Sequence, residues 1–324
     1  MNIFETLAKE FNITVDQVEK TVALIDEGNT IPFISRYRKE ITGSLDDTTL
    51  RDLNDRLNYL RNLEERRVQI SGIIEEQGKL TPEITFALNN AKTLVELEDI
   101  YRPYKPKRTT RASIARAKGL EPLAQYIMEQ RDSYDPSIED YANEFISTEE
   151  GKEVPDAAAA LQGASDIIAE DLSDNPAIRK DLRSLYHRRG SLGCQATDPD
   201  ADSVYRLYYD FNTPVSKLQD HQILAMNRGE KEGFLKPAAA IPAGVGSALV
   251  CHAALNPKNP SSFVRKAAED AFDRLIEPSV SREIRAELTQ RAGEGAIRNF
   301  ALNLRPLLMQ PPVKGFVTMG LDPG

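Results

Sequence analysis

Seven basic side chains with no acid among them lie between residues 100 and 120, and this group is the best suited in the sequence to bind phosphate. Lysine and arginine neutralise phosphates, while Tyr101 and Tyr104, placed among the first cations, could stack on unpaired bases. Nearby hydroxyl groups could donate hydrogen bonds to phosphate oxygens. The segment therefore predicts contact with nucleic acid. Its cations are Arg102, Lys105, Lys107, Arg108, Arg111, Arg116 and Lys118, and its hydroxyls belong to Thr109, Thr110 and Ser113.

The same segment has a structural interpretation, because the chain contains 50 acidic residues. The arginines could clamp neighbouring acidic helices, which would leave few cations for phosphate. Pro103 and Pro106 force an extended crossing between helical blocks, and a fixed crossing suits either role. Both interpretations stay open at the level of sequence.

A smaller basic patch, made of Arg36, Arg38 and Lys39, lies within the stretch GNTIPFISRYRKEITGSLD at residues 28–46. The stretch predicts a short turn with a glycine, followed by a helix that has Pro32 in its first turn. This is the form of a helix–turn–helix, which can present a helix to a DNA groove. Most such pairs are packing units, so structural ion pairing is the preferred role for the patch and nucleic-acid binding is the alternative.

Local signals mark both helices of this motif. Thr14 and Gln17 form a capping box at the start of the first helix. Apolar residues then recur at steps of three and four, as a buried helix face requires. On the second helix, Phe33, Ile34 and Tyr37 are expected to face inward, which would turn the three cations outward or sideways.

The composition limits how this protein could bind a polyanion. The chain has 324 residues and a formal net charge of −9, so its whole surface is a poor binder of nucleic acid and any such binding must be local. With 40% hydrophobic and 28% charged residues, it is typical of a globular protein of two or more domains. The first residues lack an export pattern and no apolar run approaches a membrane span, so we expect a cytoplasmic protein without membrane contact.

The elements that position these residues are predicted to be mainly α-helical, with a few short strands. A leucine seam marks a long helix from about residue 46 to 77, and an intrachain bundle contact is favoured over a coiled-coil dimer. Residues 204–211 are expected to be extended, residues 234–259 are left unassigned, and residues 315–322 form an apolar strand without a partner. We expect domains at 1–190, 191–314 and 315–324. The seam consists of Leu50, Leu53, Leu57, Leu60 and Leu63.

Several runs of this sequence resemble the Tex family of bacterial transcription accessory proteins, which bind RNA and DNA. Residues 28–46 and LEDIYRPYKPKRTTRASIARAKGLEPLA at residues 97–124 resemble family segments. So do LQGASDIIAE, HQILAMNRGEKEGFLK, AFDRLIEPSVSREIRAEL and LRPLLMQPPVKG, which begin at residues 161, 221, 271 and 304. The weakest resemblance is at residues 234–259.

The resemblance implies that the chain is the N-terminal helical portion of such a protein, ending at the first strand of a ribonuclease-H-like domain of the YqgF type. Helix–hairpin–helix modules and an OB-fold, which would carry much of the RNA binding, would follow. Asp322 would then stand where ribonuclease-H-like folds place their first metal-binding aspartate. Because such sites need several carboxylates, we expect Asp322 alone to be non-catalytic.

We expect a nucleic-acid-binding accessory factor without enzymatic activity, cofactor or metal. Its partners would be RNA, DNA or both, mainly through domains beyond this chain, and RNA polymerase is a further candidate. The alternative is a protein-interaction scaffold that docks through helical surfaces such as Leu50–Ile74. A third interpretation is a nuclease whose catalytic half lies elsewhere. Cys194 and Cys251 are expected to be free thiols, and the three isolated histidines do not have the spacing of a zinc site.

Overall fold

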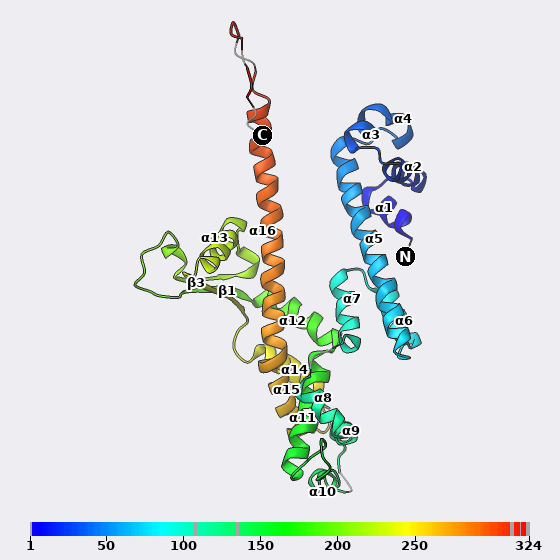
Figure 1. Cartoon of the computed structure of the whole chain (residues 1–324), viewed down its shortest axis with the longest axis vertical. Coiled ribbons are helices and arrows are strands. Elements are labelled where there is room, and N and C mark those ends of the chain that lie inside the picture. The colour runs from blue at the N-terminus through cyan, green and yellow to red at the C-terminus, as the bar shows by residue number, and fades with distance from the viewer. Residues whose placement is uncertain (1, 107–108, 134–135, 312–313, 318, 322–324) are drawn as a thin grey trace. The chain divides into compact units, whose positions relative to one another are not determined.

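A computed structural model describes residues 2–106, 109–133, 136–311, 314–317 and 319–321 (Figure 1). The described residues form many helices and one three-stranded antiparallel sheet, so the prediction of a mainly α chain is confirmed. The chain divides into two compact units, Met1–Lys107 and Arg108–Gly324. We call them the N-terminal unit and the C-terminal unit and describe each by itself.

The N-terminal unit is organised around α5 (Asp47–Glu76), a long helix that buries the predicted leucine seam. The α5 helix packs on α1 (Ile3–Phe11), α3 (Ile31–Tyr37) and α7 (Leu94–Tyr101). The intrachain interpretation of the seam is therefore confirmed. The suggestion that Leu50–Ile74 docks a partner is wrong for the leucines, because they already belong to the core of this unit.

The predicted helix–turn–helix consists of α2 (Val15–Asp26) and α3, followed by the short α4 (Lys39–Thr42). Thr14 and Gln17 form the expected capping box, and Thr30 caps α3 by accepting from the Phe33 backbone N–H at 3.4 Å. Gly28 has a φ of +86°, which glycine adopts without a steric penalty. Local sequence therefore dictates where both helices begin and how the chain turns between them.

After α5 the chain forms α6 (Pro82–Asn90) and α7, and then a single 3₁₀ turn, η1 (Arg102–Tyr104). The extended crossing predicted for this stretch is wrong as far as Tyr104. Helical backbone continues through Pro103 because a proline near the start of a helical turn gives up no hydrogen bond.

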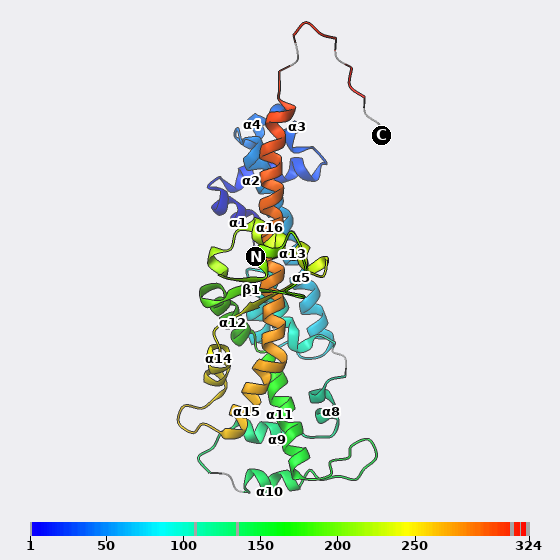
Figure 2. The same ribbon diagram turned by 90° about the vertical axis from the view of Figure 1, so that its left-hand side faces the viewer.

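The first half of the C-terminal unit is a helical layer built on α11 (Ala157–Ser173). Figure 2 shows α8 (Arg111–Ala117) and α9 (Glu121–Met128) beside it, with α10 (Ile138–Asn143) at one end. The packing of α8 on α11 is close, since a Cβ on Gly163 would come within 3.3 Å of Ala115 Cβ. The α11 helix is followed by α12 (Pro176–Arg189).

A small sheet of order β2–β1–β3 follows, made of β1 (Ser191–Ala196), β2 (Asp210–Pro214) and β3 (Leu235–Ala240). Cys194 pairs with Phe211 on one side and with Pro237 on the other. The extended run expected at residues 204–211 is only partly correct, because η2 (Arg206–Tyr208) precedes β2. The stretch left unassigned at 234–259 contains β3 and α14 (Val245–Ala254).

The remaining elements pack on the sheet and on α11. They are η3 (Val215–Lys217), α13 (Asp220–Lys231), α15 (Ser262–Asp270), the π-helical turn η4 (Ala271–Ile276) and the long α16 (Glu277–Leu308). Elements on both sides of residue 190, the expected domain boundary, share one core. Figure 1 shows the C-terminal half of α16 continuing past α13 with no other element of its own unit beside it.

The strand expected at residues 315–322 is not observed in the described part of that segment. Residues 314–317 and 319–321 form no strand, and Phe316 and Val317 are exposed. The physical reason is that a strand is stabilised by a neighbour that pairs its N–H and C=O groups, which the described residues do not supply.

Candidate nucleic-acid interfaces

The α3–α4 patch, which we define as Arg36, Tyr37, Arg38 and Lys39, is turned outward by the way α3 packs. Ile34 is fully buried against Leu24 and Leu50. Each residue turns a helix by about 100°, so Arg36 lies some 200° around α3 from Ile34. Arg36 and Lys39 are consequently exposed, and Arg38 is half-buried.

The cations of the α3–α4 patch form no ion pair with any residue that the structure describes. Arg38 instead lies over the Phe33 ring, 5.1 Å from its centroid, and donates from Nη1 to the Tyr37 carbonyl at 3.0 Å. The preferred sequence interpretation of this patch as a set of structural ion pairs is therefore wrong. Three positive charges remain available at this surface.

Tyr37 belongs to the same surface, although the sequence pattern assigned it to the core. Its side chain is 61% exposed, and its ring centroid lies 5.3 Å from that of Phe33. The pattern was misleading because Tyr37 is three residues from Ile34 and would share its face in a wide apolar stripe. The signal that could have found it is the shortness of α3, which needs only one deeply buried residue.

The acid-free segment at residues 100–120 is divided between the two compact units. Its first part lies in the N-terminal unit, its last part lies in the C-terminal unit, and Lys107 and Arg108 lie outside the described residues. Arg102 is half-buried and Lys105 is exposed, both near η1. Adjacency in sequence therefore does not make these seven cations a single binding site.

Both tyrosines of this segment face the protein interior. Tyr101 is 6% exposed, within the core of the N-terminal unit, and the Arg66 guanidinium lies 5.4 Å from its ring centroid. Tyr104 packs against the same core, and its carbonyl accepts from Gln77 Nε2 at 2.9 Å. Tyr101 is therefore not the stacking platform predicted from the sequence, since such a platform requires an open ring face, whereas Tyr104 is half-buried.

On α8 the structural interpretation of the basic segment holds for Arg116. Its guanidinium contacts three carboxylates: Glu121 at 2.8 Å, Glu170 at 2.6 Å and Asp171 at 2.5 Å. Three charge-assisted hydrogen bonds fix the side chain and cancel its charge locally. Arg116 therefore ties α8 to α11 rather than facing a phosphate.

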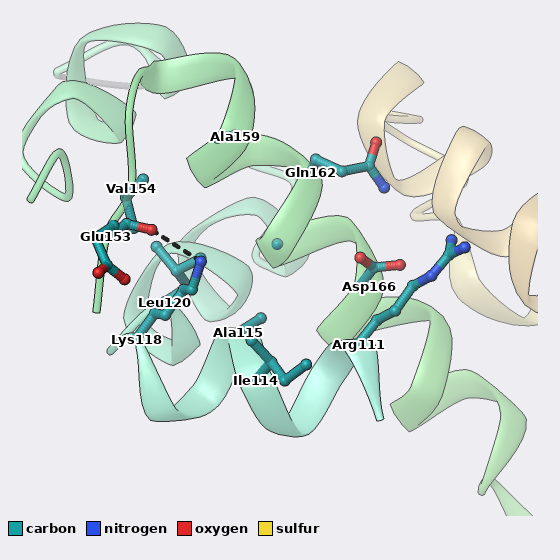
Figure 3. Close-up of a pocket in the computed structure, with 11 residues that line it drawn as sticks. Arg111, Ile114, Ala115, Lys118, Leu120, Glu153, Val154, Ala159, Gln162 and Asp166 are labelled. Atoms are coloured by element: carbon teal, nitrogen blue, oxygen red, sulfur yellow. Dashed lines mark hydrogen bonds between the residues drawn. The ribbon is translucent and has the colours of Figure 1, made fainter. Parts of the chain in front are cut away.

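The hydroxyls of this segment are also engaged. Thr110 and Ser113 form a capping box, in which the Ser113 N–H donates to Thr110 Oγ1 at 3.0 Å and the Thr110 N–H donates to Ser113 Oγ at 2.8 Å. Lys118 Nζ donates to the Glu153 carbonyl at 2.8 Å. Arg111 is exposed and forms no ion pair with a described residue, and it stands beside a pocket with Lys118 (Figure 3).

The described residues add no metal-ligand cluster. No three His, Cys, Asp or Glu side chains of the described ranges converge as metal ligands, and Asp322 lies outside those ranges. Cys194 and Cys251 are free and buried, and burial raises the pKa of both thiols. Among the described helices, none combines the length and apolar character required to cross a bilayer.

Comparison with known proteins shows two family matches along the chain. Residues 1–75 match the family described as "Tex-like protein N-terminal domain", and residues 132–300 match "Tex central region-like". The first match includes the α3–α4 patch, whereas the acid-free segment falls between the two.

Curated relatives extend well beyond this chain. It is 42% identical to "Uncharacterized protein YdcI" of Bacillus subtilis, covering 98% of this chain and 44% of the relative. It is 35% identical to "Transcriptional accessory protein Tex" of Neisseria gonorrhoeae, covering 100% of this chain and 43% of the relative. It is 31% identical to human "S1 RNA-binding domain-containing protein 1", covering 100% and 34%. The chain thus spans less than half the length of these relatives.

Proposed function

This chain belongs to the Tex family, and from that premise we propose that it is a helical portion of a nucleic-acid-binding transcription accessory factor. Its own contribution is a weak, sequence-independent contact with phosphates through the α3–α4 patch. The contact is non-catalytic and takes place in the cytoplasm. Stronger RNA or DNA binding resides in parts of such proteins that this chain does not include, and RNA polymerase is a candidate partner.

The observation that carries this proposal is the difference between exposed cations and cations that are already bound to carboxylates. Arg36, Arg38 and Lys39 form no ion pair with a described residue and stand next to the open ring of Tyr37. A cation without an acidic partner releases counterions when it meets a phosphate, whereas a cation already bound to carboxylates gains little. The names of two relatives, which refer to transcription and to RNA binding, support the same class of function.

The test is a titration of fluorescent single- and double-stranded oligonucleotides with the whole chain at several salt concentrations. Non-specific dissociation constants near 10⁻⁴–10⁻⁶ M are the expected scale, about that of other non-specific binders. Changing Arg36, Arg38 and Lys39 together to alanine should weaken binding. The log–log salt slope should become shallower by about 2–3, since each lost phosphate contact removes about 0.7–0.9.

A charge-matched control replaces Arg188, Arg189 and Lys231, three exposed cations of the C-terminal unit, with alanine. This variant changes the net charge by the same amount as the α3–α4 variant, and it should retain more of the affinity and of the salt slope than that variant does. Equal losses in the two variants would mean that only net charge matters. If the α3–α4 variant kept the affinity and the salt slope of the parent, the proposal would be refuted. Cleavage of the oligonucleotide in the presence of Mg²⁺ would refute the statement that the contact is non-catalytic.

A protein-interaction scaffold is the second candidate, and α16 favours it. The C-terminal half of this helix exposes Ile297, Phe300, Leu304 and Leu307 at steps of three and four. Such a stripe is typical of a helix face that packs against another protein surface. Binding to purified RNA polymerase that persists in high salt, and that is lost on changing Phe300 and Leu304 to serine, would support this candidate over the first.

A further inference from the structure

The C-terminal unit has a pocket between α8 and α11 that the proposed function does not use (Figure 3). Its volume is about 270 Å³, close to the lower end of the range of small-molecule sites, which is about 300–1,000 Å³. Apolar side chains line its middle, including Ile114, Leu120, Val154 and Ala159. The volume of the pocket is therefore that of a site for one small group.

Polar groups stand at the two ends of this pocket. At one end, Lys118 Nζ donates to the Glu153 carbonyl, as the dashed line in Figure 3 shows. At the other end, Figure 3 shows Arg111 and Gln162 on either side of Asp166. The pocket thus combines an apolar middle with a cation and a carboxylate at each end: Lys118 with Glu153, and Arg111 with Asp166.

Both cations retain donors for a ligand. An ammonium group has three N–H donors, and Lys118 uses one of them on the Glu153 carbonyl. Asp166, the acid nearest Arg111 in the pocket, is itself bound to Arg274 Nη2 at 3.1 Å. The charge of Asp166 is therefore shared between Arg274 and Arg111, and Arg111, whose side chain forms no hydrogen bond with a described residue, keeps its N–H donors for an anion.

We propose that the α8–α11 pocket receives one unpaired nucleobase of a single-stranded nucleic acid, while Arg111 and Lys118 face the neighbouring phosphates. The apolar middle contacts the faces of the base, and the Gln162 amide can both donate to and accept from its polar edge. This site goes beyond the α3–α4 patch, because binding there depends on contacts with a base as well as on the phosphate charge.

An apolar side chain of a peptide is the competing occupant, and the polar groups argue against it. A leucine would fill the middle of the pocket but would add no partner to the Gln162 amide or to either cation, whose present contacts are Asp166 for Gln162 and Arg111, and the Glu153 carbonyl for Lys118. A nucleotide uses all three, since its base has hydrogen-bonding edges and its phosphates are anionic. The chemistry at the two ends therefore favours the nucleotide.

The experiment compares two labelled probes with the whole chain: a short oligomer of deoxythymidylate, and an abasic oligomer of the same length. Both carry the same phosphates, so the difference between their affinities measures the contribution of the base. We expect the base-containing probe to bind about three- to tenfold more tightly, in line with other contacts to single bases. Equal affinity for the two probes would overturn the proposal.

Two variants locate the effect. Ala159→Leu fills the pocket and should abolish the preference for the base-containing probe while leaving affinity for the abasic probe unchanged. Ala158→Leu, at a neighbouring position that does not line this pocket, is the matched control and should keep the preference. Arg111→Gln should weaken binding of both probes, whereas Arg188→Gln should have less effect. A preference that survives Ala159→Leu would overturn the proposal.

A direct readout avoids any dependence on the folding of a variant. In the unaltered chain, the methyl resonances of Ile114 and Val154 should shift with the base-containing probe and not with the abasic one. Absence of these shifts at saturation, or displacement of the probe by a leucine-containing acidic peptide that shifts the same methyls, would overturn the nucleobase assignment. Loss of phosphate affinity in the α3–α4 variant leaves this readout intact, so the two proposals can fail separately.

Discussion

Arg36 on α3 and Arg116 on α8 belong to sequence patches of the same type, yet the fold treats them in opposite ways. Arg36 is exposed and forms no ion pair with a described residue, whereas Arg116 contacts three carboxylates within 2.8 Å. Part of the charge of the richer basic segment is therefore neutralised within the fold, whereas the cations of the poorer one form no ion pair with a described residue. The number of cations in a segment does not measure its capacity to bind phosphate, because acids distant in sequence decide which charges remain available.

The two regions also differ in what their aromatic residues do. Tyr37 was expected in the core and lies on the surface, while Tyr101 was expected at a ligand and lies in the core. In each case the packing of a single helix decides the outcome. On α3, one buried isoleucine suffices to hold a short helix. On α7, the core of the N-terminal unit needs the tyrosine to fill its end.

The largest expected effect tests whether Arg116 is structural. Arg116→Ala should lower the free energy of unfolding by about 1.5–3 kcal/mol, because the hydrogen bonds it loses are to charged groups and Glu170 is left buried without this partner. Urea denaturation followed by circular dichroism measures the change. The control is Arg188→Ala, at an exposed position on α12, which should change stability by less than about 0.5 kcal/mol.

If Arg116→Ala left the free energy of unfolding unchanged and instead weakened oligonucleotide binding, Arg116 would be a phosphate ligand like Arg36, and the two basic regions would not differ in role. The same measurement on Arg36→Ala sharpens the contrast. That variant should lose affinity for oligonucleotides while its denaturation midpoint stays within error of the parent.

An intermediate effect tests the turn that places the α3–α4 patch. A Cβ on Gly28 would meet no atom within 4 Å, so the cost of Gly28→Ala comes only from the backbone at φ +86°. We expect destabilisation by about 1–2 kcal/mol, the usual cost of a left-handed conformation for a residue with a Cβ. Thermal or urea denaturation measures it.

Gly72→Ala provides the matched comparison within the N-terminal unit. Gly72 lies inside α5, and a Cβ there would also meet no atom within 4 Å. This change should stabilise by about 0.5–1 kcal/mol, because alanine is the better helix former. If Gly28→Ala and Gly72→Ala changed the free energy of unfolding in the same direction, Gly28 would not be held in the left-handed conformation.

The smallest effect concerns two carboxylates that face arginines in different settings. The hydrogen bond from Arg61 holds the pKa of Asp26 below its ordinary value, whereas burial raises the pKa of Asp166 although Arg274 and Arg111 act against it. Carbon-13 NMR titration of the carboxyl groups should place the two values on opposite sides of about 3.9, the usual aspartate pKa.

The two aspartates should also change stability in opposite directions with pH. The contribution of Asp26 is present above the unfolded pKa and is lost as pH falls through its lowered folded value. The contribution of Asp166 is present below the unfolded pKa and is lost as pH rises through its raised folded value. In Arg61→Ala the pKa of Asp26 should return toward normal. An Asp166 pKa at or below the usual value would contradict this prediction.

The sequence by itself determined the helices, their starts and the buried seam of α5. These features depend on interactions between neighbours along the chain: capping boxes at Thr14 and Thr110, a left-handed glycine at position 28, and leucines repeating at helical steps. Where a strand required a distant partner, as at residues 204–211 or 315–322, prediction from the sequence was incomplete or wrong. Pairing partners lie far away in the chain, and local pattern does not reveal them.

Only the tertiary structure decided which candidate residues face solvent. Arg116 is neutralised by Glu170 and Asp171, more than fifty residues away, and Tyr101 is covered by the core around α5. Arg111 and Lys118 come to flank one pocket because α8 packs on α11 through Gly163. The sequence specifies the charges and rings, but their availability is set by electrostatic and packing contacts between residues that are distant in sequence. Those contacts exist only once the chain has folded.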